Sequence, residues 1–154
     1  MKRLDQFPDK AAAIAYIQAE KGCTTVKDAE KYLLQHLPKE SYYQDKIIKF
    51  LRAAYPKAFV WKAEAGMYTR GGIPDVCAVI NGRFYGFEVK RPYIGVLSKI
   101  QEQTIRRIQA AGGTAAVVCF PEEVRKIVEE DENDRKGTRS QPSVPDYFRT
   151  PGNE

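Results

Sequence analysis

Residues 73–90 read IPDVCAVINGRFYGFEVK, in which two apolar and aromatic runs flank Asn81-Gly82. An Asn-Gly pair between two such runs is the strongest short-range signal for a β-hairpin closed by a two-residue turn. In that turn the two flanking residues pair, and the same register continued outward places Asp75 directly across from Glu88. The stretch therefore predicts two antiparallel strands, 73–80 and 83–90, with opposed acidic residues near their open end.

The predicted hairpin gathers three charged side chains on one face. Asp75 and Glu88 are cross-strand neighbours, and Lys90 shares their face because strand side chains alternate. Directly opposed carboxylates have Cβ atoms about 5 Å apart, and like charges so placed destabilise a sheet. Without a cation or a shared proton the pair is unfavourable, so the pattern indicates a divalent-metal site with a lysine at its edge.

Glu40 begins a predicted helix over 40–54. At 100° per residue it lies on the same stripe as Ile47 and Leu51, whereas Lys49 lies on the opposite side. A carboxylate on a buried stripe needs a partner, which favours a place beside Asp75 and Glu88. Alternatively, Glu40 only interacts with the positive end of its own helix dipole.

Gln101 falls in the apolar sector of a second predicted helix, which begins at Ser98 and ends near Ala111. Its place on the buried side favours a role next to the acidic pair. Ser98 and Gln101 also form a capping-box pattern, which is a purely structural explanation. Both interpretations stay open at this point.

The other periodic segments extend the hairpin into a layered domain. Together with the segments above, their order of helix, three strands, helix, strand and helix predicts an α/β sandwich with a mixed sheet. The additional predicted elements are helices over 11–20, 26–37 and 122–130, and strands over 58–62 and 114–120.

The chain divides into three expected parts. Residues 1–38 form an N-terminal helical extension, with Asp9 and Thr25 as helix caps. Residues 39–130 form the core. Residues 131–154 are charged, rich in proline and poor in aliphatic residues, and are expected to be a flexible tail.

Composition narrows the classes of function. The 154 residues carry a formal charge of +5 with a pI near 9.1, which is compatible with a polyanionic partner. Three scattered cysteines and a single histidine argue against a disulfide framework or a zinc site, so a metal would take oxygen ligands. No membrane-length apolar run, signal-peptide pattern or Walker-type phosphate loop is present, so we expect a cytoplasmic protein of a bacterial or phage-infected cell, with no membrane partner and no nucleotide cofactor.

The residues around the predicted hairpin resemble the motif of a known protein family. Gly72-Ile73-Pro74-Asp75, followed after a hairpin by Glu88-Val89-Lys90, resembles the motif of the PD-(D/E)xK nuclease superfamily. Within it, the chain is similar to the VRR-NUC family, the virus-type replication-repair nucleases. The similarity spans about residues 40–120 and implies a restriction-endonuclease-like αβββαβ core. It also draws on Gln44, Ile47, Trp61-Lys62, Gly66, Gly71, Gly82, Gly95, Ser98, Gln101 and Ala111-Gly112-Gly113.

The resemblance implies a chemistry for the charged positions. Glu40, Asp75, Glu88 and the backbone carbonyl of Val89 would hold Mg²⁺ or Mn²⁺, which are hard cations that prefer oxygen ligands. Lys90 would position or deprotonate the attacking water, or stabilise the phosphorane-like transition state, and these roles are not separated here. Gln101 would be a supporting catalytic residue.

Basic residues in or near the loops that lead to this site are candidate DNA contacts. Phosphate binding by such residues is largely blind to base sequence, and each of them is alternatively a solvated surface charge. We expect Tyr68 and Tyr93 to anchor these loops, with stacking on unpaired bases as the alternative. The candidate DNA contacts are Lys62, Arg70, Arg91 and Lys99.

The expected function is a divalent-metal-dependent DNA endonuclease. Stand-alone VRR-NUC proteins resemble Holliday-junction resolvases, which implies a homodimer that cuts branched DNA in repair or recombination. Alternatives are a catalytically idle DNA-binding module that kept a nuclease fold, and a restriction-type or nicking nuclease. A glycosidase with paired carboxylates fits poorly, because of Lys90, the basic balance and the short chain.

Overall fold

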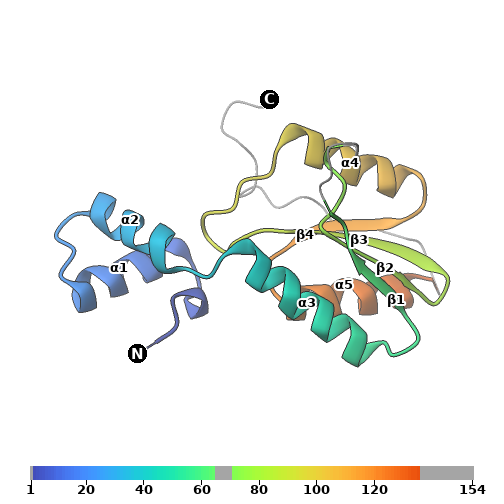
Figure 1. Ribbon diagram of the computed structural model, residues 1–154, viewed down its shortest axis with the longest axis horizontal. Helices are drawn as coiled ribbons and strands as arrows, with labels where there is room; N and C mark the ends of the chain where they lie inside the picture. Colours follow the sequence, from blue (N-terminus) through green and yellow to red (C-terminus); the bar gives the residue numbers. More distant parts are fainter. Residues whose placement is uncertain (1, 65–70, 136–154) are drawn as a thin grey trace.

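The computed structural model describes residues 2–64 and 71–135 of the chain. A helical hairpin at the N-terminus lies beside an α/β domain, to which a short linker joins it (Figure 1). No described helix is both long and apolar enough to cross a membrane. The elements are η1 (Leu4–Gln6), α1 (Lys10–Lys21), α2 (Val26–His36), α3 (Glu40–Ala54), β1 (Phe59–Lys62), β2 (Val76–Ile80), β3 (Arg83–Val89), α4 (Lys99–Ala110), β4 (Thr114–Val118) and α5 (Pro121–Asp134).

The N-terminal helices begin and end within one residue of the expected positions. The Asp9 side chain accepts a hydrogen bond from the amide of Ala12 at 2.7 Å and so caps α1. Gly22 ends α1 in the left-handed conformation at φ 66°, and Thr25 caps α2. The two helices pack through their own apolar cluster, formed by Ala13, Ile14, Ile17, Ala29, Leu33 and Leu37.

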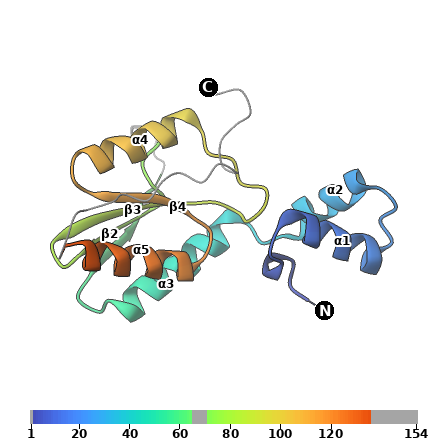
Figure 2. The ribbon, with the colours of Figure 1, turned by 180° about the vertical axis from the view of Figure 1, so that it is seen from behind.

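The sheet has the order β1-β2-β3-β4. Strands β1, β2 and β3 are antiparallel neighbours, whereas β4 runs parallel to β3. A parallel pair needs a crossover connection, and α4 supplies it. Helices α3 and α5 cover one face of the sheet and α4 lies on the other (Figures 1 and 2). The observed order is the expected αβββαβ core with a mixed sheet and an N-terminal helical extension, so the predicted fold class is confirmed.

The hairpin has the predicted register. Ile80 pairs with Arg83 and Val76 pairs with Phe87. Asn81 and Gly82 both have positive φ, at 50° and 76°, which is the backbone of a type I′ turn. Because the register runs unbroken to Val76, the next residue outward, Asp75, comes opposite Glu88.

The strands are shorter than expected. The ladder of β2 begins at Val76 rather than at residue 73, since Gly72 adopts φ 89° and Pro74 has no N–H to donate. β4 ends at Val118, because the next two backbone amides donate to the side chain of Glu123 at the start of α5.

The predicted boundary between the core and the C-terminal tail, at residue 131, is too early. Helix α5 continues to Asp134, and Asp131 is 6% exposed. Its carboxylate accepts hydrogen bonds from the hydroxyls of Tyr85 and Thr114, at 2.7 Å and 3.0 Å, and pairs with Arg83. The core therefore includes residues 131–134, because three side chains of the sheet hold one acidic residue that composition alone assigns to solvent. Residues 136–154 lie outside the described part of the chain.

Candidate active site

The open end of the hairpin brings Asp75 and Glu88 together. Asp75 lies directly before β2, and its Oδ2 accepts a hydrogen bond from the amide of Val89 at 2.8 Å. Its own carbonyl accepts from the amide of Ala63 at 2.8 Å, which ties it to the end of β1. The charge of Asp75 acts directly on the carboxyl group of Glu88 and raises its pKa. The opposed acidic pair that the turn predicts is present.

Glu88 is the most deeply buried charged residue of this group, at 1% exposed. Its Oε1 accepts a hydrogen bond from Nε2 of Gln101 and lies 3.3 Å from Nζ of Lys90. Burial, and then the neighbouring charge of Asp75, raise the pKa of Glu88 to about 8, against the opposing effect of Lys90. At neutral pH the buried pair therefore retains a proton that a bound cation would displace.

Lys90 is held close to Glu88 by its backbone as well as by charge. Its amide donates to the carbonyl of Val118 at 2.9 Å, one residue beyond the β3–β4 ladder. Its side chain is 9% exposed. A Cβ on Gly95 would lie 2.6 Å from the Cβ of Lys90, so only glycine allows the following loop to fold back against the lysine stem.

Gln101 caps α4 and also contacts Glu88. Its backbone amide and its Oε1 complete the capping box with Ser98, at 3.2 Å and 2.9 Å. Its Nε2 is left to donate to Glu88. The cap thus fixes the amide orientation that the contact with Glu88 needs.

Glu40 lies at the margin of this group. It is the first residue of α3, and burial raises the pKa of its carboxyl, with Lys90 opposing the rise and Asp75 adding to it. Within residues 2–64 and 71–135, however, no three His, Cys, Asp or Glu side chains gather closely enough to hold a metal ion. The structure therefore places Glu40 in the electrostatic field of Lys90 and Asp75, but not in the close group that Asp75 and Glu88 form.

The basic candidates separate into different environments. Lys62 is exposed at the end of β1, with its Nζ 3.9 Å from Asp45, and Lys99 is exposed in the first turn of α4. Arg70 and Tyr68 lie outside the described residues. Lys62 and Lys99 thus remain available to a polyanion.

The side chain of Arg91 donates its hydrogen bonds to backbone carbonyls of the protein itself. Its Nη2 donates to the carbonyls of Leu34 and Leu37, at 2.8 Å and 2.7 Å, and its Nε donates to the carbonyl of Pro38 at 2.9 Å. These bonds hold the guanidinium against the end of α2, and the DNA contact expected of Arg91 stays a prediction. No local sequence signal reveals these bonds, because the partners are more than fifty residues apart.

Tyr93 anchors its loop, as the sequence suggests. Its hydroxyl accepts from the amide of Phe7 at 3.0 Å and donates to the carbonyl of Phe7 at 2.7 Å. The hydroxyl of Tyr93 is therefore bonded to the N-terminal segment of the chain.

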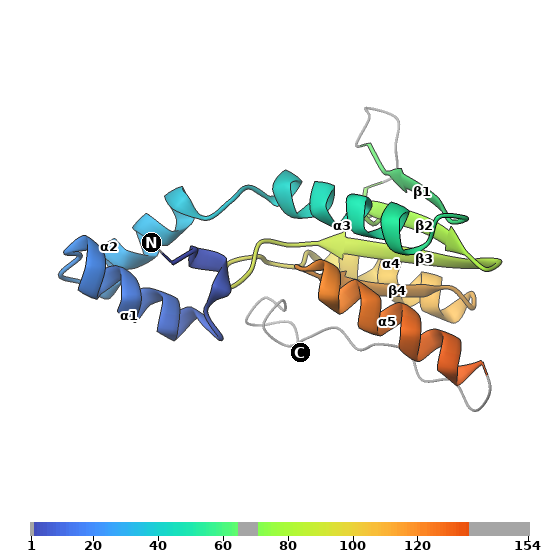
Figure 3. The same cartoon turned by 90° about the horizontal axis from the view of Figure 1, so that it is seen from below.

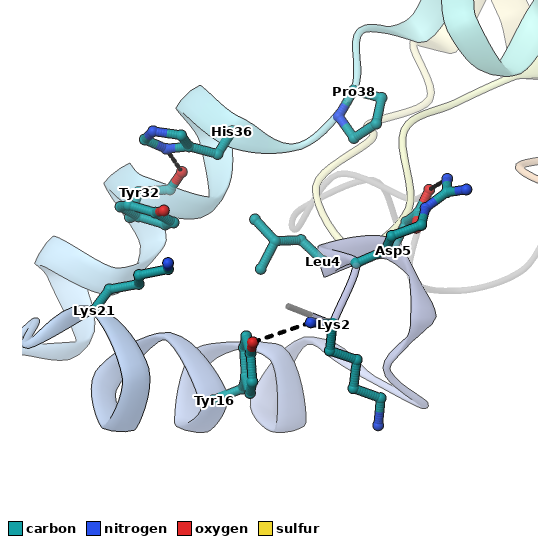
Figure 4. A pocket seen from close by; sticks show the side chains of 9 residues that line it. Lys2, Leu4, Asp5, Tyr16, Lys21, Tyr32, His36 and Pro38 are labelled. Atoms are coloured by element: carbon teal, nitrogen blue, oxygen red, sulfur yellow. Dashed lines mark hydrogen bonds and ion pairs between the residues drawn. The ribbon is translucent and has the colours of Figure 1, made fainter.

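A hollow of about 290 Å³ lies apart from the acidic pair, between η1, α1 and α2 (Figure 4). Its lining includes Leu4, Tyr16, Tyr32 and His36. Tyr16 accepts a hydrogen bond from the backbone amide of Lys2, and the rings of Tyr32 and His36 stack at 3.8 Å. The polar groups of the hollow thus largely bond to one another.

Comparisons with known proteins show a structural similarity. No family model matches the chain, and no curated protein does. Among solved structures, a chain described as "VRR_NUC domain" superposes with a TM-score of 0.47 at 21% sequence identity, over 56% of this chain and 95% of that one. The description names the same family that the motif residues resemble.

Proposed function

We propose that this protein is a divalent-metal-dependent DNA endonuclease with its active site at the open end of the β2–β3 hairpin. One observation carries the proposal. Glu88, an acidic residue 1% exposed, contacts Asp75, Lys90 and Gln101 at the same time. Buried carboxylates are unfavourable unless a cation or a proton compensates them, and perturbed groups of this kind cluster at functional sites.

The donor set fits Mg²⁺ or Mn²⁺. Asp75 and Glu88 offer hard carboxylate oxygens. The neighbouring thiol of Cys77 does not compete for such an ion, since it is buried and burial raises its pKa to about 11. The carbonyl of Val89 faces the same edge of β3 as its N–H, which donates to Asp75. Asp75, Glu88 and the Val89 carbonyl would hold the ion, and Glu40 would complete the set from α3.

A bound divalent ion would lower the pKa of a coordinated water and stabilise negative charge on the phosphate. The protein's own residues supply orientation. Gln101 fixes the carboxylate of Glu88, and Glu88 in turn holds the ammonium of Lys90. Lys90 would then position or deprotonate the attacking water, or stabilise charge on the transferring phosphate.

Lys62 and Lys99 are the described residues best placed to contact DNA phosphates, because both are exposed and lie on elements that border the site. Arg70 is proposed with them from the sequence. Such contacts would make binding salt-dependent and insensitive to base sequence. We propose branched DNA as the substrate and a homodimer as the active form, since a four-way junction has two equivalent cleavage points.

The proposal is tested by incubating the protein with supercoiled plasmid in Mg²⁺, in Mn²⁺ and in a chelator. Metal-dependent nicking supports it. Binding without cleavage in either metal would favour the alternative, a catalytically idle DNA-binding module. Cleavage confined to one duplex sequence would favour a restriction-type or nicking nuclease.

A further inference from the structure

Arg91 joins the end of β3 to the end of α2 and to the linker that precedes α3. It directly follows Lys90, and it donates three hydrogen bonds to the carbonyls of Leu34, Leu37 and Pro38. Pro38 lies in the linker between α2 and α3, two residues before Glu40 (Figure 4). A single planar side chain thus connects the end of β3 to the start of α3.

The chain between this contact and the candidate site is short on both sides. One peptide bond separates Arg91 from Lys90. Only Lys39 lies between Pro38 and Glu40, so their Cα atoms are at most about 7 Å apart. These short connections leave the backbone little freedom to compensate for a movement of the Arg91 side chain. A displacement of Arg91 would therefore reach Lys90 and Glu40 nearly undiminished.

The loop that follows Arg91 is held in place at two further points. Tyr93 adopts φ 66°, a conformation that non-glycine residues rarely take, while its hydroxyl bonds to both backbone groups of Phe7. The amide of Gly95 donates to the carbonyl of Arg91 at 3.0 Å, and Gly95 packs against the Cβ of Lys90. The N-terminal segment therefore stabilises a strained loop that contacts the lysine.

The N-terminal helices also contact α3 directly. Asp5 pairs with Arg3 at 2.7 Å and accepts a hydrogen bond from the hydroxyl of Tyr43 at 3.0 Å. Tyr43 lies in the first turn of α3, close to Glu40. The helical hairpin lies beyond the end of the α/β domain at which β3 ends and α3 begins (Figure 3).

We infer that Arg91 is a positioning residue that fixes the separation of Lys90 and Glu40, and that residues 2–37 complete the catalytic unit instead of serving as a separate DNA arm. The catalytic half of this inference rests on the proposed function. The positional half concerns Lys90 in the free protein and is tested without DNA or metal.

The first test compares Arg91→Gln and Arg91→Lys with Arg125→Gln, which removes one arginine charge from the exposed side of α5. Lysine keeps the charge but loses the fork that reaches three carbonyls. We expect both Arg91 variants to lower kcat for plasmid nicking about tenfold or more, the factor to which one charge-assisted hydrogen bond corresponds. KM and its salt dependence should stay near those of the wild type, and Arg125→Gln should leave kcat unchanged.

A different pattern would overturn the inference. If Arg91 instead contacts phosphate, Arg91→Lys cleaves like the wild type, whereas Arg91→Gln raises KM and weakens the salt dependence of binding.

The second test measures how fast the Lys90 amine reacts with isotopically labelled acetic anhydride in the metal-free protein, using mass spectrometry. Lys90 is nearly buried beside Glu88, while Lys126 on α5 is exposed and serves as the internal reference. We expect both Arg91 variants to accelerate labelling of Lys90 relative to Lys126 about tenfold, because local opening exposes the amine. An unchanged ratio in a folded variant would refute the positioning role.

Tyr93→Phe covers the case in which the Arg91 variants do not fold. It keeps the ring and removes both hydrogen bonds to Phe7. It should shift Lys90 labelling in the same direction by a smaller factor, and no shift would refute the inference. If the wild type cleaves no DNA, the proposed function fails, and the labelling experiment still decides whether Arg91 holds Lys90 in place.

Discussion

Lys90 Nζ lies 3.3 Å from Glu88 Oε1 with both side chains at most 9% exposed. Two residues apart on one strand, they share a face and a nearly water-free environment, in which an ion pair persists only with further hydrogen bonds. Gln101 provides such a bond to Glu88, whereas Asp75 opposes the ionised form of Glu88. The pair is thus the centre of the candidate site, and most of the predictions below concern it.

Lys90→Ala should abolish cleavage. Removal of a group that transfers or orients a proton costs about 10²- to 10⁴-fold in rate. Cleavage of plasmid DNA under single-turnover conditions measures the effect, with DNA binding in Ca²⁺ as the control for substrate affinity. A variant that binds DNA and cuts at the wild-type rate would remove Lys90 from the mechanism.

Asp75→Asn should stop cleavage and weaken metal binding. The amide keeps the size of the carboxylate and an oxygen that can accept from Val89, but it lacks the negative charge that a divalent ion requires. Titration of Mn²⁺ followed by calorimetry checks the binding. Equal affinity for Mn²⁺ in the variant and the wild type would show that the metal assignment is wrong.

The stability of the metal-free protein should fall as pH rises from about 4.5 to about 8. Burial and Asp75 raise the pKa of Glu88 to about 8, from its usual value of 4.5, with Lys90 opposing. Glu88 thus binds its proton more tightly in the folded state than in the unfolded state. The stability gained from this difference is fully present below the pKa of Glu88 in the unfolded chain, and it is lost as pH rises to the pKa in the folded protein. Thermal unfolding at a series of pH values measures this effect.

Glu88→Gln is the matched control for that pH dependence. Because glutamine carries no proton to lose, the variant should gain melting temperature relative to the wild type as pH approaches 8. Added Mg²⁺ should reduce the difference in melting temperature between Glu88→Gln and the wild type, because it should stabilise only the wild type. A pH dependence that persists unchanged in Glu88→Gln would assign it to another group.

Gly95→Ala should lower kcat without unfolding the protein. The new Cβ would meet the Cβ of Lys90 at 2.6 Å and the carbonyl of Arg91 at 2.8 Å, so the loop and the lysine must move apart. A misplacement of about 1 Å at a catalytic group can cost about 10²-fold in rate. Steady-state kinetics and a melting curve together separate this effect from a loss of fold.

Branched DNA should be cut in preference to linear duplex. A panel of labelled four-way junctions, flaps, nicked duplexes and linear duplexes, cut at equal concentration, measures the preference. Equal rates on all of them would remove the structure-specific part of the proposal and leave a general nuclease. Analytical ultracentrifugation of the same preparation tests the homodimer.

Much of this protein follows from interactions between residues close together in the chain. The Asn81-Gly82 turn sets the register that opposes Asp75 and Glu88, since two residues with positive φ permit only one pairing. Asp9, Thr25 and Ser98 begin their helices at the expected places, because a capping side chain reaches backbone amides only two or three residues ahead. These features can be read from sequence because their energetics are local.

Tertiary structure decided what surrounds those residues. The composition around Asp131 indicates a solvated tail, yet Tyr85 and Thr114 bury it in the core. Arg91 looks like a surface charge until the carbonyls of α2 meet it. Burial and the direction of a side chain depend on segments that are distant in sequence and meet only in the folded chain, and no local pattern encodes their approach. The acidic pair could thus be predicted from the hairpin alone, whereas its environment, and with it the pKa of Glu88, could not.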